Sequence, residues 1–159
     1  MKIRYSYKEY KDHPEATEIS KMRGIGFTFY SIGHSWGGFS CLNITAFHPD
    51  VSRVVAISGF VSVKILVSFF FGGVLKPYRK AVMRLEEKSN PIYSKCDSVE
   101  TLSKTKAKTL LIYSDNDPLC PKAVHYDTLE AGLRDSENVR LLLVSSKGHN
   151  PNYTEEAVR

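Results

Sequence analysis

Short apolar runs alternate with segments of helical spacing along most of the chain. Residues 25–32 (Ile-Gly-Phe-Thr-Phe-Tyr-Ser-Ile) combine aromatic and β-branched side chains, which favours a strand. Residues 36–47 have apolar side chains at helical spacing, with Leu42 and Ala46 expected to point inward. This helix should end at His48, because a residue that precedes a proline disfavours helical dihedral angles. The pattern therefore predicts a strand that runs directly into a helix.

Three further apolar runs are predicted strands, at residues 53–58, 109–113 and 139–144. Such near-continuous apolar runs are typical of parallel strands that are covered on both faces. A helix is predicted between the last two strands, over residues 121–133. The order strand, helix, strand, long excursion, strand, helix, strand is that of a doubly wound α/β protein. We therefore expect a mainly parallel sheet with helices on both faces.

The excursion over residues 60–107 is longer than the usual crossover between parallel strands. It starts with an apolar segment, residues 61–74, and continues with a predicted helix over residues 77–88. We interpret it as a small helical cap. Because the chain shows no internal repeat, low-complexity tract or linker, residues 1–159 are predicted to form a single domain that carries this cap.

Composition and charge exclude several classes of function. Hydrophobic residues make up 42% of the 159 residues and aromatic residues 11%, which is enough for a packed core. The formal net charge is +5, yet basic and acidic residues are interleaved without a basic run, so no nucleic-acid partner is expected. The most apolar stretch, residues 65–75, is about half the roughly 20 residues that span a bilayer, so no membrane insertion is expected.

The spacing of cysteine and histidine residues indicates neither a metal site nor a cofactor. The 3 cysteines are widely spaced and include no Cys-x-x-Cys pair, and the histidines show no ligand spacing. This cysteine usage, together with an N-terminus that lacks the apolar stretch of a signal peptide, favours a reduced, cytoplasmic location. Cys120 is expected to be a small packed side chain.

The pentapeptide Gly-His-Ser-Trp-Gly at residues 33–37 lies between the first predicted strand and its helix. A strand, a tight turn and a helix form the setting that a nucleophile elbow requires, because the glycines allow a strained turn that exposes the side chain of Ser35. The backbone N–H of Trp36 stands at the helix N-terminus, where the partial positive charge stabilises a developing oxyanion. Ser35 is therefore a candidate nucleophile.

Acidic and basic side chains follow the later strands. Asp115 and Asp117 come directly after the third predicted strand, and His149 comes after the fourth. An imidazole with a pKa near 6.5 can take the proton of a serine hydroxyl at neutral pH, and a carboxylate can fix its tautomer. Either aspartate is compatible with that role. His34 is expected to be structural, because it precedes the candidate nucleophile Ser35.

The hexapeptide at residues 33–38 resembles the nucleophile elbow of the α/β-hydrolase family, whose triad follows the chain order Ser, Asp, His. The Asp-Pro pair and the later proline within residues 117–121 are similar to the acid loop of that family, which favours Asp117 over Asp115. The Gly-His pair at residues 148–149 is similar to its histidine loop.

This resemblance covers about residues 27–153 and implies a serine hydrolase that cleaves an ester, thioester or amide of a small acyl substrate through an acyl-enzyme. It implies Ser35 as the nucleophile, His149 as the base and Asp117 as the triad acid, with no cofactor. The apolar start of the cap, residues 60–74, would lend an acyl-side pocket. Residues 69–71 are expected to pack in the core or the cap, and a substrate-facing role for some of them is the alternative. The fold by itself does not choose the substrate.

The α/β-hydrolase family builds several strands and a helix before its elbow, whereas 34 residues precede Ser35. These hold an expected edge strand at residues 3–7 and an expected helix at residues 14–22. The resemblance therefore implies an N-terminally truncated, partial α/β-hydrolase fold. Trp36 supplies one oxyanion donor, and the second has no assigned residue. A missing N-terminal segment or a homodimer would cover the exposed edge beside residues 25–32.

Two other functions stay open at this point. The chain is alternatively a non-catalytic or fragmentary binding module that keeps the fold but lacks a complete oxyanion hole. The Asp-x-Asp sequence at residues 115–117 also matches haloacid-dehalogenase-type phosphatases, which need Mg²⁺ and a long chain after that motif. Only 42 residues follow Asp117, which argues against a phosphatase.

Overall fold

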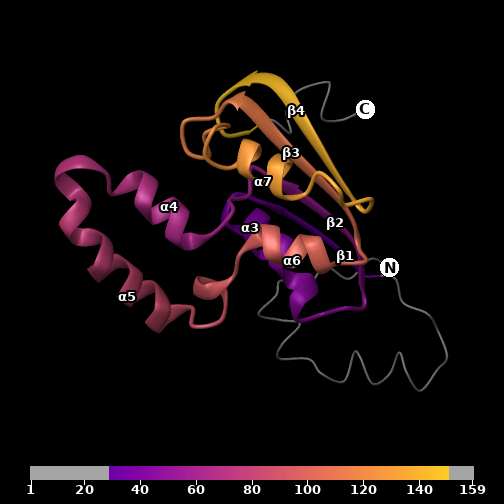
Figure 1. Ribbon diagram of the computed structural model, residues 1–159, viewed down its shortest axis with the longest axis horizontal. Helices are drawn as coiled ribbons and strands as arrows, with labels where there is room; N and C mark the ends of the chain where they lie inside the picture. Colours follow the sequence, from indigo (N-terminus) through magenta and orange to yellow (C-terminus); the bar gives the residue numbers. More distant parts are fainter. Residues whose placement is uncertain (1–28, 151–159) are drawn as a thin grey trace.

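A four-stranded parallel sheet runs through residues 29–150, the part of the chain that the computed structural model describes (Figure 1). Its strands lie side by side in chain order: β1 (Phe29–His34), β2 (Val51–Ile57), β3 (Lys108–Asn116) and β4 (Val139–Lys147). Each neighbouring pair is parallel. The prediction of a mainly parallel α/β sheet is confirmed.

Strands β1, β3 and β4 are longer at their carboxyl ends than the hydrophobic pattern indicates, whereas β2 ends one residue earlier, at Ile57. β1 continues two residues past the predicted end to His34, which pairs in register with Ile57 of β2. β3 continues through three polar residues to Asn116, which pairs with Lys147 of β4. The start of the first predicted strand, residues 25–28, lies outside the described residues. The strand ends that carry polar side chains are therefore held by the parallel ladder.

Helices α3 (Trp36–Asn43), α6 (Ser98–Lys104) and α7 (Tyr126–Gly132) form one layer against one face of the sheet. Their apolar side chains meet those of β2 and β3 in a single core cluster. The buried members of this cluster are Leu42, Ala56, Val61, Leu102, Leu111, Tyr113, Tyr126, Leu129 and Leu133. On the opposite face of β1, Tyr30 and Ile32 are 61% and 73% exposed, so no helix of the described range 29–150 covers that face of β1.

Two helices are shorter than predicted. The expected helix over residues 36–47 ends as α3 and continues as a 3-10 turn (Ile44–Ala46), which changes the face that its last residues present. Leu42 is fully buried as expected, but Ala46 is exposed, so its predicted inward position is wrong. Helix α7 begins five residues later than predicted, because residues 122–125 form turns.

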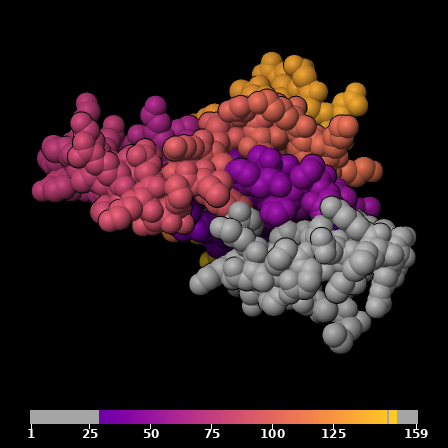
Figure 2. All heavy atoms as spheres, turned by 90° about the horizontal axis from the view of Figure 1, so that it is seen from below, coloured from indigo at the N-terminus to yellow at the C-terminus, as the bar shows by residue number. Residues whose placement is uncertain are grey.

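The excursion between β2 and α6 folds as a helical segment that projects from one end of the sheet (Figures 1 and 2). It holds α4 (Val63–Phe70), a 3-10 turn (Gly73–Tyr78), α5 (Arg79–Ser89) and a second 3-10 turn (Tyr93–Lys95). Arg79 ties α5 to α4, since its guanidinium donates to the carbonyl oxygens of Phe71 and Ser68, both at 2.6 Å.

Several expectations lie outside the described residues. These are the edge strand over residues 3–7, the helix over residues 14–22 and the chain beyond residue 150. The extent of a single domain over residues 1–159 stays a prediction. Within residues 29–150, the helices are all too short or too polar to cross a bilayer.

The turn between β1 and α3 depends on two glycines that have no room for a side chain. A Cβ atom on Gly33 would lie 2.2 Å from the carbonyl oxygen of Gly37, and one on Gly38 would lie 2.9 Å from that of Ile57. Both obstacles are backbone atoms, which cannot rotate away. A Cβ atom on Gly37 would meet no heavy atom within 4 Å.

We predict that Gly33→Ala lowers the free energy of unfolding by at least about 1–3 kcal/mol, because the methyl group forces the backbone of the turn apart. The matched variant Gly37→Ala should be neutral or gain about 0.5–1 kcal/mol, since it replaces a helical glycine in open space. Urea denaturation followed by circular dichroism measures both values. Equal destabilisation by the two substitutions would contradict the close packing of this turn.

Candidate active site

The three candidate residues of the triad stand in loops at one edge of the sheet. Ser35 directly follows β1, Asp117 directly follows β3, and His149 comes shortly after β4. Because the strands are parallel, their carboxyl ends meet at the same edge, where open α/β sheets bind their ligands. The topology therefore brings together residues that are 82 (117 − 35) and 32 (149 − 117) positions apart in the sequence.

Ser35 occupies a strained turn. Its backbone has φ 56° and ψ −117°, a region that non-glycine residues rarely adopt and that costs on the order of 1–3 kcal/mol. Two hydrogen bonds hold the turn: the Ser35 N–H donates to the oxygen of Ile57 at 2.9 Å, and its carbonyl oxygen accepts from Phe39 at 2.9 Å. The surrounding structure thus fixes a conformation that leaves the Ser35 side chain partly exposed at the start of α3.

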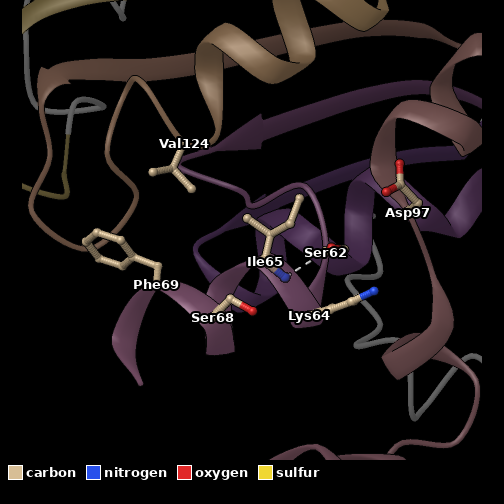
Figure 3. A pocket seen from close by; sticks show the side chains of 7 residues that line it. All are labelled: Ser62, Lys64, Ile65, Ser68, Phe69, Asp97 and Val124. Atoms are coloured by element: carbon tan, nitrogen blue, oxygen red, sulfur yellow. Dashed lines mark hydrogen bonds between the residues drawn. The ribbon is translucent and has the colours of Figure 1, made fainter. Parts of the chain in front are cut away.

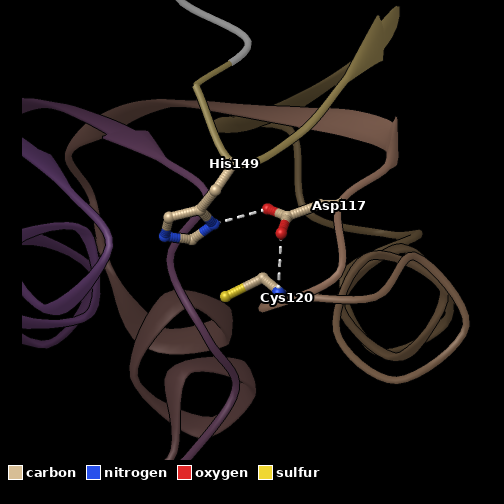
Figure 4. A group of neighbouring side chains, drawn as sticks. All are labelled: Asp117, Cys120 and His149. Atoms are coloured by element: carbon tan, nitrogen blue, oxygen red, sulfur yellow. Dashed lines mark hydrogen bonds and ion pairs between the residues drawn. The ribbon is translucent and has the colours of Figure 1, made fainter.

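Asp117 and His149 form a hydrogen-bonded pair (Figure 4). The Nδ1 atom of His149 lies 2.7 Å from Oδ2 of Asp117, whose side chain is fully buried. The other carboxylate oxygen accepts from the N–H groups of Leu119 and Cys120 at 2.8 and 2.9 Å. The carboxylate is oriented by the acid loop, and a single oxygen is left to face the imidazole.

Asp115 has a different environment. Its carboxylate accepts from the backbone N–H of Ser146 and the hydroxyl of Ser145, both at 3.2 Å, and these bonds are exposed. Asp115 therefore ties the carboxyl ends of β3 and β4 together, while Asp117 is the aspartate that contacts His149. Of the two aspartates, Asp117 is the one whose carboxylate faces the imidazole.

The second ring nitrogen of His149 is the atom that a base would use. Nε2 is buried and has no hydrogen-bond partner among the described residues. Ser35 is not hydrogen-bonded to it, so the structure brings Ser35 and His149 to the same edge without joining them directly. Hydrogen bonds of this kind are often formed only when a substrate is bound. With Nδ1–H donating to Asp117, the lone pair of Nε2 stays available to accept a proton.

The backbone of His149 is held by two residues that the sequence did not single out for this role. Its carbonyl oxygen accepts from Nε2 of His34 at 2.6 Å and from the hydroxyl of Ser58 at 3.2 Å. Ser58 is fully buried and has a positive φ of 48°, the second such non-glycine residue after Ser35 in the described chain. His34 and Ser58 thus fasten the histidine loop to the ends of β1 and β2.

Two buried groups near Asp117 stay uncharged at neutral pH. Burial raises the pKa of Cys120 to about 12, and the negative charge of Asp117 adds to that shift. Burial lowers the pKa of His125 to about 4, even though Asp117 favours its protonation. Because neither group supplies a positive charge at pH 7, the Asp117 carboxylate depends on its hydrogen bonds for stabilisation.

Trp36 opens α3 and has two features that suit a site. Its backbone N–H is among the first helical donors, which have no acceptor within the helix. Its side chain is 50% exposed and packs edge-on against Phe60, with ring centroids 4.8 Å apart. Phe60 in turn stacks on the buried Phe39 at 4.3 Å. The candidate oxyanion donor is therefore anchored by an aromatic stack, and no second donor is assigned among the described residues.

A hollow of about 530 Å³ lies beside α4 rather than at the triad (Figure 3). Phe69 contributes to its wall, but none of Ser35, Asp117 and His149 does. The residues that line the hollow are Ser62, Lys64, Ile65, Ser68, Phe69, Asp97 and Val124.

Comparison with known proteins agrees with the fold. Residues 5–159 match the prolyl oligopeptidase family. The chain belongs to that family. Among curated proteins, none matches the sequence significantly.

Solved structures similar to this family member are α/β-hydrolases and peptidases. An α/β-hydrolase enzyme from a lagoon-sediment metagenome of Mar Chica, Morocco, has a TM-score of 0.54 at 22% identity, over 89% of this chain and 62% of that one. A puromycin-hydrolyzing peptidase of Mycobacterium tuberculosis has a TM-score of 0.62 at 17% identity, over 91% of this chain and 22% of that one. Pyrococcus horikoshii acylaminoacyl peptidase has a TM-score of 0.62 at 19% identity, over 87% of this chain and 23% of that one. The chain thus spans less than two thirds of each, and the likeness shows an α/β-hydrolase fold.

The buried His125 predicts how stability depends on pH. Its pKa is about 4 in the folded chain and 6.5 as the ordinary value, so between these pH values the unfolded chain binds the extra proton. Above about pH 6.5 the imidazole is neutral in both states, and His125 does not make the stability depend on pH. As the pH falls from about 6.5 to about 4, protonation of the unfolded chain lowers the free energy of unfolding by about 3 kcal/mol in total.

Replacing His125 with asparagine removes this titration and keeps an acceptor for the Val61 N–H, which donates to Nδ1 of His125 at 3.4 Å. Urea denaturation of both proteins from pH 7 to pH 4 should give a flatter dependence for His125→Asn. Since every other group titrates in both proteins, parallel curves would contradict the burial of a neutral His125.

Proposed function

We propose that this chain is a serine hydrolase that cleaves an ester, thioester or amide through an acyl-enzyme, with Ser35, Asp117 and His149 as its triad. The observation that carries the proposal is the 2.7 Å hydrogen bond between Asp117 and His149, which leaves Nε2 of His149 unpaired at the edge where Ser35 stands. Membership of the prolyl oligopeptidase family and likeness to α/β-hydrolase structures support hydrolase chemistry.

In the first half of the reaction, the Ser35 oxygen attacks the carbonyl carbon of the substrate while Nε2 of His149 takes the hydroxyl proton. The imidazolium that forms keeps its Nδ1–H bond to the Asp117 carboxylate, which stabilises the new positive charge. Nε2 then gives the proton to the leaving group, and the acyl group stays on Ser35. Water repeats the sequence in the second half, which releases the acid and restores the serine.

The negative charge that develops on the carbonyl oxygen needs donors that are already in place. The backbone N–H of Trp36 is one such donor, because it opens α3 and has no intrahelical acceptor. The N-terminus of the helix adds a partial positive charge. Loss of one oxyanion donor lowers a rate by about a hundredfold to a thousandfold, so the second donor decides how fast the enzyme works.

A binding module without catalysis is the second candidate. Two observations favour it: Ser35 and His149 are not hydrogen-bonded to each other, and the described residues include one candidate oxyanion donor. Such a module would keep the Asp117–His149 pair as a structural link between the loops. Chemical reactivity of Ser35 separates the two candidates.

The proposal predicts that a fluorophosphonate probe reacts with Ser35 of the purified chain, because the probe needs an activated serine, a base and an oxyanion donor together. Mass spectrometry of the labelled peptides should place the adduct on Ser35, and Ser35→Ala should abolish it. Intact chain that stays unlabelled while it is cooperatively folded would exclude the catalytic function and leave the binding module.

Substitution of the two aspartates tests which of them supports the base. Asp117→Asn should slow labelling by about a thousandfold to ten-thousandfold, because the amide no longer holds His149 in the tautomer with a free Nε2. Asp115→Asn is the matched control, since Asp115 lies two residues away at the end of β3 and contacts serines of β4 but not His149. It should leave the labelling rate unchanged. A loss of labelling in Asp115→Asn alone would overturn the assignment.

A further inference from the structure

A cysteine stands against the acid and the base of the triad. A carboxylate oxygen of Asp117, the sulfur of Cys120 and a ring nitrogen of His149 all lie within 4.8 Å of one another (Figure 4). Within residues 29–150, no other group of three or more potential ligands comes as close. The spacing of cysteines and histidines in the sequence gave no sign of a metal site, because these ligands come from two loops 29 (149 − 120) residues apart.

The ligand types select the metal. Sulfur, imidazole nitrogen and carboxylate oxygen are the three donors that Zn²⁺ takes in proteins, whereas Mg²⁺ and Ca²⁺ take oxygen donors. A thiolate further favours Zn²⁺ over harder cations. Three protein ligands with one open position, filled by water, are a common arrangement for zinc.

The carboxylate of Asp117 is already oriented as a ligand. Its Oδ1 atom accepts from the N–H groups of Leu119 and Cys120, so Oδ2, which is hydrogen-bonded to His149, is the oxygen that would bind a cation. Hydrogen bonds of this kind hold metal ligands in place and are a large part of metal affinity. The Cys120 thiol donates to the carbonyl oxygen of Ser58 at 3.3 Å, a bond that is weak and easily given up.

Binding requires a modest local movement. Ligand atoms in tetrahedral zinc sites lie about 3.3–3.8 Å apart, as follows from bond lengths of about 2.0–2.3 Å. If the metal takes Nδ1, this atom and Oδ2 must therefore separate from 2.7 Å. All the ligand atoms already lie within 4.8 Å of one another. Movement of His149 alone suffices for the separation, because Asp117 is fixed by its own loop.

We propose that Asp117, Cys120 and His149 bind Zn²⁺ and that the bound metal switches off the triad. Metal binding stands on the ligand geometry, and the inhibition rests on the function proposed above. The Cys120 thiol releases its proton to solvent when the sulfur binds. If the metal takes Nδ1 of His149, the proton of that nitrogen moves to Nε2; if it takes Nε2, the lone pair is used. In both cases no ring nitrogen is left to accept the proton of Ser35.

Cobalt provides a readout that does not depend on activity, because Co²⁺ takes zinc sites and a cobalt–thiolate bond gives a charge-transfer absorption in the near ultraviolet. Titration of the reduced, metal-free full chain with Co²⁺ should produce this absorption with one equivalent bound, and Zn²⁺ should displace it. Cys120→Val and Cys120→Ala should both lose the absorption and bind Zn²⁺ at least about a hundredfold more weakly.

The other cysteines supply matched controls. Cys41 lies on α3, where it is buried and accepts a hydrogen bond from Ser31 of β1. Cys96 lies in the excursion and donates to the carbonyl oxygen of Ile92. Both cysteines are outside the cluster, so Cys41→Ser and Cys96→Ser should keep the absorption. Absence of the absorption in the unsubstituted chain, or its persistence in both Cys120 variants, overturns the zinc site. Two variants of different size guard against a single one that fails to fold.

Labelling of Ser35 then tests the inhibition separately. Zn²⁺ should block fluorophosphonate labelling of the unsubstituted chain, a chelator should restore it, and labelling of Cys120→Val should resist Zn²⁺ by at least about a hundredfold in concentration. Labelling that Zn²⁺ leaves intact at saturating occupancy overturns the switch. If the chain binds Co²⁺ through Cys120 but the probe never labels Ser35, the metal site is supported and the proposed hydrolase function is excluded.

Discussion

The hydrogen bond between Asp117 and His149 is the interaction on which the site depends. It joins the loops after β3 and β4, and it lies where the carboxylate is fully buried and the imidazole nearly so. A buried carboxylate is costly unless all its acceptor positions are used, and here two backbone N–H groups and the imidazole share them. Loss of either partner would leave an uncompensated polar group in the interior.

The strained turns at Ser35 and Ser58 both lie at the edge of the sheet that carries the candidate site. Both residues have positive φ values and both follow the carboxyl end of a strand. Ser35 is held by the backbone of β2, and Ser58 fastens the carbonyl oxygen of His149 together with His34. Strain of this kind persists only where neighbouring structure fixes it, which is common at functional sites. The sheet edge thus holds three loops in one fixed geometry.

Much of this architecture could be predicted from the sequence, because local patterns carry it. The apolar runs of the strands, the glycine-rich elbow and the aspartate and histidine after the last two strands are short-range features. The ends of helices were harder: the 3-10 turn that exposes Ala46 and the turns before α7 depend on tertiary packing rather than on propensity.

His34 has the structural position and Cys120 the packed position that the sequence predicts, but the partners of these residues and of Ser58 could not be predicted, because each contact reaches a distant part of the chain. Ser58 contacts His149 across 91 positions of the sequence, and His34 contacts it across 115. No spacing rule connects such pairs. The choice of Asp117 over Asp115 had a sequence signal only through resemblance to a family loop. In the structure it follows from which carboxylate the acid loop turns inward.

The tautomer of His149 tests the central claim most directly. Long-range nitrogen–proton correlation spectra of the ¹⁵N-labelled chain, with His149 assigned by comparison with His149→Gln, show which ring nitrogen carries the proton when the imidazole is neutral. The Asp117–His149 bond predicts a proton on Nδ1 and a bare Nε2. A proton on Nε2 would contradict it, since that imidazole could neither donate to Asp117 nor act as the base for Ser35.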